Sequence, residues 1–178
     1  QEALALTHIE KNVFLVKPDN RYFVGNTPHG GYLQALMHKA LVTILPHATA
    51  ISSSVQFLDR IEDDDLTLTV DIYKISRGSS SGVVRAIQDD KVCAVFTGTC
   101  SDFEHMKGYS GLNTPLPKIF DESNMANYVE MNYDKISKGF TPNFIKQLKC
   151  LVHPDHAWWN KEELEEDAEA RCSAFLEL

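Results

Sequence analysis

The tripeptide His29-Gly30-Gly31 is the part of the sequence whose residue types point most directly to chemistry. It precedes a run of helical apolar periodicity, so both glycines fall in a first helical turn, where backbone N–H groups lack intrahelical partners and carry partial positive charge. Such groups can stabilise an oxyanion, and glycine lets a ligand approach them closely. Alternatively, the glycines only permit tight packing, and His29 caps the helix or packs against it. The residues leave both interpretations open.

The helix that would position these groups is predicted from Gly30 to Leu45, and Pro46 ends it. Its apolar residues repeat at the spacing of one helical face: Leu33, Leu36, Met37, Ala40, Leu41 and Ile44. Ala35, Val42 and Leu45 widen this face, so we expect the helix to be covered on most sides.

Strands follow the helix and could cover it. Leu66 to Ile72 alternates strictly between apolar and polar residues, which is typical of a half-buried strand. Asp89-Asp90 separates two further runs, as expected of a hairpin. The other predicted strands are 12–16, 54–58, 82–88 and 91–99. We therefore predict an α+β fold, in which an antiparallel sheet wraps around one long central α-helix.

The chain is predicted to contain one unit over 1–102, a Gly- and Pro-rich linker over 103–124 and a second region over 125–178. The second region has weaker patterns. They favour a strand at 128–133, a short helix or strand at 143–151, a helix at 162–170 and a strand at 171–178.

Composition excludes several function classes. A net charge of −8 without clustered Lys or Arg argues against nucleic-acid binding. The longest apolar stretch, 40–45, is too short to span a membrane, so we expect a cytoplasmic protein. The chain has four cysteines: Cys93, Cys100, Cys150 and Cys172. They have neither CxxC nor zinc-ligand spacing, so we expect them to be reduced thiols. Cys93 is expected to be a buried structural residue.

Three segments, 26–33, 54–60 and 76–88, together resemble the thioesterase-like hot-dog superfamily in their order and spacing. The double hot-dog acyl-CoA thioesterases are the relatives that this resemblance suggests. It implies hydrolysis of an acyl-CoA by an activated water, with the Gly30 or Gly31 N–H stabilising the thioester oxyanion. His29 would orient or cover the substrate, and Asn26 is grouped with these catalytic residues.

The resemblance also implies a substrate-binding loop at Arg77, Gly78, Ser79 and Ser80, where a guanidinium and N–H groups could meet oxygens of coenzyme A. A solvent-facing turn is the alternative. Coenzyme A would enter as part of the substrate, with no separate cofactor. The run from His153 to His156 contains possible metal ligands but no third partner at a known spacing, so no metal site is predicted.

Two positions depart from the family pattern. Single-unit members usually have a carboxylate nine residues after the motif histidine and an amide six residues before it, whereas this chain has His38 and Phe23. His38 could act as a base instead. In double hot-dog members the catalytic Asp, Thr and Gln lie in the second unit. Residues 171–178 resemble the strand entering that unit's helix, so we expect the second unit to be incomplete.

The leading functional prediction is an acyl-CoA thioesterase-like protein. A non-catalytic acyl or acyl-CoA binding module is the alternative, favoured by the missing acid at position 38. A hot-dog hydratase or dehydratase is a third class, but no Asp follows His29 within the helix. Because hot-dog units bury a sheet edge by pairing, we expect a homo-oligomer, with Trp158 and Trp159 marking a contact between units.

Overall fold

The structure is a computed structural model and describes residues 2–109, 111, 127–137, 139–157, 159 and 174–177. The chain divides into two compact units, Gln1–Gly108 and Tyr109–Leu178. No helix of the described residues is both long enough and apolar enough to cross a membrane.

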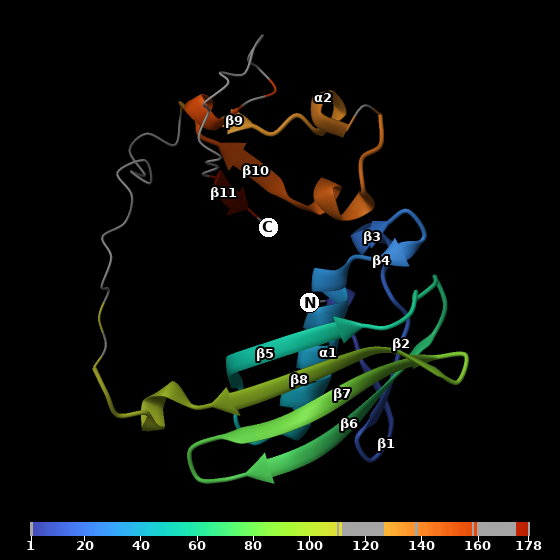
Figure 1. Cartoon of the computed structure of the whole chain (residues 1–178), viewed down its shortest axis with the longest axis vertical. Coiled ribbons are helices and arrows are strands. Elements are labelled where there is room, and N and C mark those ends of the chain that lie inside the picture. The colour runs from blue at the N-terminus through green and yellow to red at the C-terminus, as the bar shows by residue number, and fades with distance from the viewer. Residues whose placement is uncertain are drawn as a thin grey trace. The chain divides into compact units, whose positions relative to one another are not determined.

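A six-stranded sheet forms most of the first unit (Figure 1). Every neighbouring pair of strands is antiparallel, and the strand order is β1-β2-β6-β7-β8-β5. The strands are β1 (Thr7–Glu10), β2 (Val13–Val16), β5 (Thr49–Phe57), β6 (Leu66–Ile75), β7 (Ser80–Gln88) and β8 (Lys91–Ser101). All the strands predicted in this region are present. β1 was not predicted, because its four residues are exposed and form no buried face.

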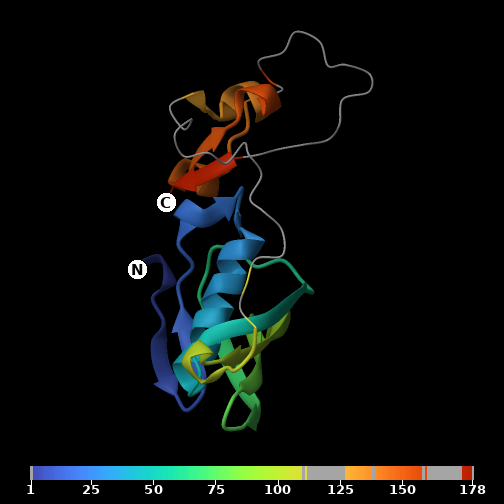
Figure 2. The same cartoon turned by 90° about the vertical axis from the view of Figure 1, so that its left-hand side faces the viewer.

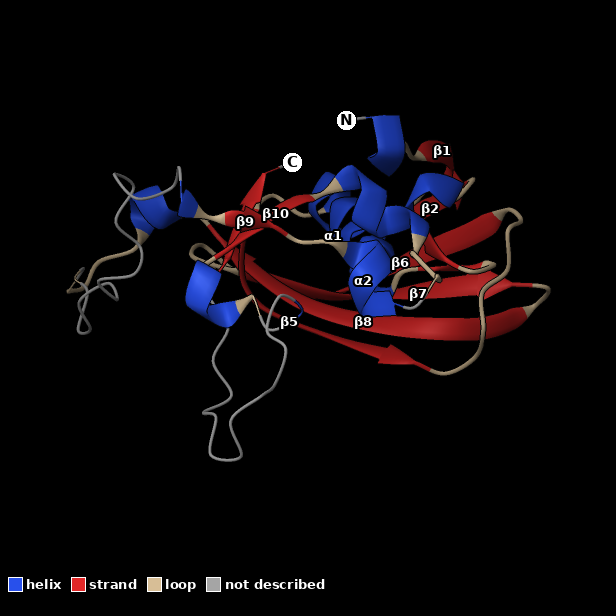
Figure 3. Ribbon diagram, turned by 90° about the horizontal axis from the view of Figure 1, so that it is seen from above, coloured by secondary structure: helices blue, strands red, loops and turns tan. Residues whose placement is uncertain are grey.

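The single long helix of this unit, α1 (Gly30–Ile44), lies along one face of the sheet, which curves beside it (Figures 2 and 3). His29 is its N-cap and Leu45 its C-cap, so the helix predicted from Gly30 to Leu45 is confirmed to within one residue. The predicted α+β hot-dog architecture is confirmed. The expected cover on most sides is only partly present within the unit, since Ala35 and Val42 are half-buried and Lys39 is exposed.

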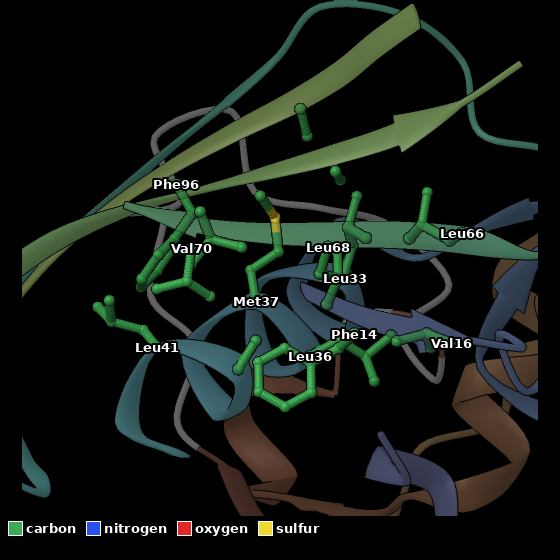
Figure 4. Packing of buried hydrophobic residues seen from close by; sticks show 14 of the residues in the cluster. Phe14, Val16, Leu33, Leu36, Met37, Leu41, Leu66, Leu68, Val70 and Phe96 are labelled. Carbon is green, nitrogen blue, oxygen red and sulfur yellow. The ribbon is translucent and has the colours of Figure 1, made fainter. Parts of the chain in front are cut away.

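The core lies between α1 and the sheet (Figure 4). Its largest fully buried side chains include Phe14, Leu36, Met37, Leu68 and Phe96. Burying a side chain of this size contributes about 1.5–3 kcal/mol. This packing holds the helix at a fixed register on the sheet and so fixes the position of its first turn.

Leu41 of α1 packs against two glycines of the sheet. Gly82 and Gly98 are direct partners on β7 and β8. A Cβ at Gly82 would lie 2.8 Å from Leu41 Cδ1, and a Cβ at Gly98 would lie 2.6 Å from Leu41 Cδ2. The two glycines therefore form the depression in which the Leu41 side chain sits.

The hairpin predicted at Asp89-Asp90 is confirmed. Both residues have positive φ, 51° and 60°, as a two-residue type I′ turn requires. The register of the pairing shifts at four places, between His8 and Glu10 on β1, Ala50 and Ser52 on β5, Ile72 and Lys74 on β6, and Ala86 and Ile87 on β7.

Short elements complete the first unit. They are the 3-10 helices η1 (Glu2–Leu4), η2 (Asn20–Tyr22) and η3 (Phe103–His105) and the two-residue strands β3 (Phe23–Val24) and β4 (Thr27–Pro28). β3 and β4 pair with each other and lead directly into α1.

The second unit contains a three-stranded sheet of order β11-β10-β9. Its elements are β9 (Val129–Glu130), α2 (Tyr133–Ser137), η6 (Asn143–Gln147), β10 (Lys149–Val152), η7 (Pro154–His156) and β11 (Ala174–Glu177). The predicted strand 128–133 is wrong beyond Glu130, because the Asn132 side chain accepts the Lys135 N–H and α2 begins. Segment 143–151 contains both a 3-10 turn and a strand. The helix predicted at 162–170 lies outside the described residues.

Candidate functional site

The first turn of α1 is closed on one side by His29. His29 Nδ1 accepts a hydrogen bond from the Gly31 N–H at 3.2 Å, and the His29 N–H donates to the Tyr22 carbonyl at 2.9 Å. The imidazole is therefore the N-cap of the helix. Among the described residues, the Gly30 N–H has no hydrogen-bond acceptor. Gly30, rather than Gly31, has a donor available for a ligand.

The ring of Phe57, at the end of β5, packs on Gly30. A Cβ at Gly30 would lie 2.9 Å from Phe57 Cζ and 3.3 Å from Phe57 Cε2. The packing interpretation of this glycine therefore has a physical basis in the structure. It does not conflict with the oxyanion interpretation, because a contact at the Cβ position leaves the N–H unbonded.

A hollow of about 240 Å³ lies between α1 and β5. Gln34 Nε2 donates to Ser53 Oγ at 3.3 Å beside it. His38 lines the same hollow, and its buried Nε2 has no hydrogen-bond partner among the described residues. The hollow is lined by Gly31, Gln34, Ala35, His38, Ala50, Ser53 and Phe96.

A second hollow, also of about 240 Å³, adjoins Gly30 on its Phe57 side and includes Leu33 and Ile61 in its wall. Asp59 places a carboxylate in this wall. That carboxylate is 3.9 Å from Lys91 Nζ, and its Oδ1 accepts the Arg60 N–H at 2.8 Å. The first turn of α1 thus borders two hollows, each lined by at least one side chain that can accept a proton.

Asn26 and Phe23 flank the segment that leads into the helix. Asn26 is exposed in the turn between β3 and β4, next to Gly25, whose φ is +62°. Phe23 is 2% exposed and belongs to the interior, so the position where single-unit relatives have an amide is occupied here by an apolar side chain.

The predicted substrate-binding residues lie at the other end of α1. Arg77, Gly78 and Ser79 form the turn between β6 and β7, and Ser80 begins β7. Ser80 Oγ is 3.0 Å from Nδ1 of His47, which follows the C-terminus of the helix. A 15-residue helix is about 22 Å long at 1.5 Å per residue. The structure therefore does not bring this turn and the Gly30 turn together within one unit.

Tyr32 ties the start of α1 to the N-terminal segment. Its hydroxyl donates to the Ala3 carbonyl at 2.8 Å and accepts the Asp19 N–H at 2.9 Å. Burial raises the pKa of Tyr32, which keeps the phenol neutral. The Arg21 guanidinium hydrogen-bonds the Asp19 carboxylate and lowers its pKa. These contacts fix the chain that leads to the first turn.

The cysteines and the histidine cluster offer no second centre in the described part of the chain. Cys93 is buried as expected, and burial raises the pKa of the Cys100 thiol. Within the described ranges, no group of three His, Cys, Asp or Glu residues is placed to hold a metal ion. His153 instead caps η7, because its Nδ1 accepts the Asp155 N–H at 3.3 Å. Cys172 and Trp158 lie outside the described residues.

Sequence reasoning missed Gln34, Ser53, Asp59 and His47. Gln34 lies one turn before His38, so their shared helix face was a signal that could have found it. Ser53, Asp59 and His47 acquire their neighbours only through strand pairing and gave no local signal.

Comparison with known proteins agrees with this geometry. The family profile of the acyl-CoA thioesterase N-terminal domain matches residues 18–101. No curated protein matches the chain at a comparable level of significance.

Solved structures share the fold at low sequence identity. A proposed thioesterase II from Thermobifida fusca has a TM-score of 0.71 at 16% identity, and the match covers 88% of this chain and 55% of the Thermobifida chain. A hot-dog protein of unknown function from Alicyclobacillus acidocaldarius has a TM-score of 0.70 at 15% identity, covering 84% and 53%. The acyl-CoA thioesterase II of Mycobacterium marinum has a TM-score of 0.60 at 14% identity, covering 94% and 54%.

This chain spans about half the length of each of these structures. The family match lies wholly within the first unit, in the segment that contains α1 and the sheet strands β5 to β8. Residues 18–101 of the first unit are therefore similar to the acyl-CoA thioesterase N-terminal domain, and the unit shares its fold with a hot-dog protein of known structure.

Proposed function

We propose that this protein binds an acyl-CoA and hydrolyses its thioester, with the thioester carbonyl oxygen at the first turn of α1. The observation that carries the proposal is the Gly30 N–H, which has no acceptor among the described residues and belongs to a residue that lines the hollow beside Phe57. The match of residues 18–101 to an acyl-CoA thioesterase domain supports this choice of substrate. An N–H at a helix start favours the negative charge that the carbonyl oxygen gains during attack.

In the proposed reaction, the oxygen of a water attacks the thioester carbonyl carbon while a base takes its proton. The carbon–sulfur bond then breaks, and coenzyme A leaves as a thiolate that is reprotonated. His38 is our candidate base, since its Nε2 is buried beside the hollow and makes no hydrogen bond among the described residues. Coenzyme A serves as part of the substrate and no separate cofactor is invoked.

A non-catalytic acyl-CoA binding module is the second candidate function. It is favoured by the imidazole at position 38, where single-unit relatives have a carboxylate, and by the His29 ring that already occupies the Gly31 N–H. In such a module the hollows would hold the ligand without activating water.

The two candidates are separated by following thiol release from acyl-CoAs of several chain lengths, together with calorimetric binding of a non-hydrolysable thioether analogue. Turnover that His38→Ala greatly reduces supports hydrolysis with His38 as the base. Analogue binding without turnover supports the binding module. If neither turnover nor binding is detected, both candidates are wrong.

We also propose that a second hot-dog unit, supplied by another copy of the chain, pairs with β5. Among the described residues only β8 pairs with β5, at one edge. The nine residues of β5 include no charge and are mostly exposed, with Ile51 46% and Phe57 54% exposed. A long, uncharged edge of this kind favours pairing. A copy seated there would also cover the hollow that contains His38.

Sedimentation equilibrium tests this pairing. We expect a dimer for the chain as it stands and a shift toward monomer in Ile51→Lys, which places a charge on the edge. A monodisperse monomer of the unaltered chain would contradict the proposal.

A further inference from the structure

Gln34 places an amide side chain in the wall of the hollow between α1 and β5. Its Nε2 donates to the hydroxyl of Ser53 on β5 at 3.3 Å, and this bond sets the orientation of the amide. The other arm of the amide, Oε1, accepts no hydrogen bond from the described part of the chain. The amide therefore has an acceptor, directed away from Ser53, that a water in the hollow can use.

The residues of α1 that line this hollow include three that follow one face of the helix. Gly31, Gln34 and His38 are spaced at i, i+3 and i+7. At a rise of 1.5 Å per residue, Gln34 is about 4.5 Å and His38 about 10 Å beyond Gly31 along the helix axis. Helical side chains lean toward the N-terminus, so the His38 ring lies over the turn that contains Gln34. Gln34 thus lies between the first turn of α1 and our candidate base.

A water that attacks a thioester at the first turn needs more than a base. The His38 ring can take one of its protons, but a single hydrogen bond leaves the water free to rotate about that bond. A second acceptor fixes the direction in which the lone pair of the water oxygen points, and such orientation lowers the barrier to attack. Gln34 Oε1 provides an acceptor in the same hollow as the ring, and the hydrogen bond to Ser53 restrains it there.

We infer that Gln34 is a catalytic residue that holds the attacking water between its Oε1 and the His38 ring, with Ser53 as a positioning residue that acts through the amide. The inference rests on the proposed function and extends it from the base to the orientation of the nucleophile.

In this step the water oxygen forms a bond to the thioester carbonyl carbon, and one of its protons passes to His38. The second proton stays on the oxygen, hydrogen-bonded to Gln34 Oε1. The carbon–sulfur bond then breaks, and the coenzyme A thiolate takes the proton from His38. Gln34 itself neither gains nor loses a proton.

Three variants test the inference through kcat for thiol release and calorimetric binding of the non-hydrolysable thioether analogue. Gln34→Leu removes the amide, so we expect kcat to fall roughly 10- to 100-fold. Binding of the analogue, which no water attacks, should be unchanged. Gln34→Glu keeps an acceptor oxygen at the same place and should lose much less of kcat. Ser53→Ala frees the amide to rotate, so it should lower kcat by about 3- to 10-fold and add little in the Gln34→Leu background.

Gln56→Leu is the matched control, because it makes the same chemical change at an exposed position of β5 that does not line the hollow. It should leave kcat unchanged. An unchanged kcat in Gln34→Leu would overturn the inference. An equal loss of analogue affinity would overturn it as well, since Gln34 would then bind the substrate and not the water.

Equal losses of kcat in Gln34→Glu and Gln34→Leu, or full additivity of Ser53→Ala with Gln34→Leu, would also contradict the assignment. If His38→Ala reduces turnover and Gln34→Leu does not, the proposed function stands without the inference. If the unaltered chain releases no thiol, the proposed hydrolysis and the inference fail together.

Discussion

The aromatic ring of Phe57 occupies the space that a side chain at Gly30 would need, with Cζ 2.9 Å from the ideal Cβ position. The last residue of β5 therefore covers the first residue of α1. The contact joins the edge of the sheet to the turn whose N–H we assign to the thioester oxygen.

Gly30→Ala should lower or raise the free energy of unfolding, depending on whether the Phe57 ring is present. Alone, the new methyl group must displace the ring, so we expect a loss of up to about 1 kcal/mol. In a Phe57→Ala background the same substitution should be neutral or stabilising, because alanine favours the helix over glycine by up to about 1 kcal/mol. Chemical denaturation of the four proteins measures both effects, and an identical loss in both backgrounds would contradict the packing account.

Gly98→Ala should destabilise the fold by about 1–3 kcal/mol, because its Cβ would lie 2.6 Å from Cδ2 of the fully buried Leu41. Part of this cost should disappear in a Leu41→Ala background. Gly82→Ala is the matched comparison: its Cβ would lie 2.7 Å from the Asp71 carbonyl oxygen, which truncating Leu41 does not move. If Leu41→Ala reduced the stability loss of Gly98→Ala and of Gly82→Ala equally, this description of the helix–sheet contact would be contradicted.

Tyr32→Phe should lower the free energy of unfolding by about 1–3 kcal/mol, because it leaves the Ala3 carbonyl and the Asp19 N–H without their shared partner. Tyr22 stacks on Tyr32 with ring centroids 4.9 Å apart and provides the control. Its hydroxyl makes no hydrogen bond among the described residues, so Tyr22→Phe should change stability little. Similar losses in the two variants would argue that ring packing, not the hydroxyl, matters.

The pair formed by Asp19 and Arg21 should make a small pH-dependent contribution to stability. The hydrogen bond from Arg21 lowers the pKa of Asp19, so the ionised carboxylate is favoured in the folded state. The contribution is then fully present above the ordinary aspartate pKa of about 4 and is lost as pH falls through the lowered value.

Thermal unfolding measured from neutral to acid pH should show a shallower decline for Asp19→Asn than for the unaltered chain. The difference should be modest because the pair is partly exposed to solvent. Glu10→Gln removes an exposed carboxylate that has no ion pair among the described residues, and it should leave the acid dependence unchanged. If Asp19→Asn also leaves the acid dependence of unfolding unchanged, the ion pair contributes nothing to stability.

The sequence predicted the parts of the fold that repeat a regular pattern. Leu33, Leu36 and Met37 indicated the helix, and the alternation from Leu66 to Ile72 indicated β6. The first half of β5 was missed because it is exposed and a bulge near Ile51 breaks its alternation. β1 was missed because all its residues are exposed.

The candidate site was predictable only where neighbours in sequence are also neighbours in space. His29, Gly30 and Gly31 meet in one turn, and their placement followed from the helix itself. The contact of His47 with Ser80, residues separated by 33 positions, arises from sheet pairing and had no local signature. For the same reason, sequence spacing did not indicate that the Arg77 turn and the Gly30 turn lie at opposite ends of α1.

The most direct test of the central claim is the ratio of kcat/KM for acyl-CoA hydrolysis between Gly30→Pro and Gly30→Ala. Both substitutions add a Cβ beside Phe57, but only proline removes the N–H. Proline is well tolerated at the first helical position, and His29, with φ −59° and ψ 136°, already has the extended backbone that a following proline requires. We predict that kcat/KM falls by about 100-fold or more in Gly30→Pro relative to Gly30→Ala. Equal kcat/KM values for the two folded variants would contradict an oxyanion role for the Gly30 N–H.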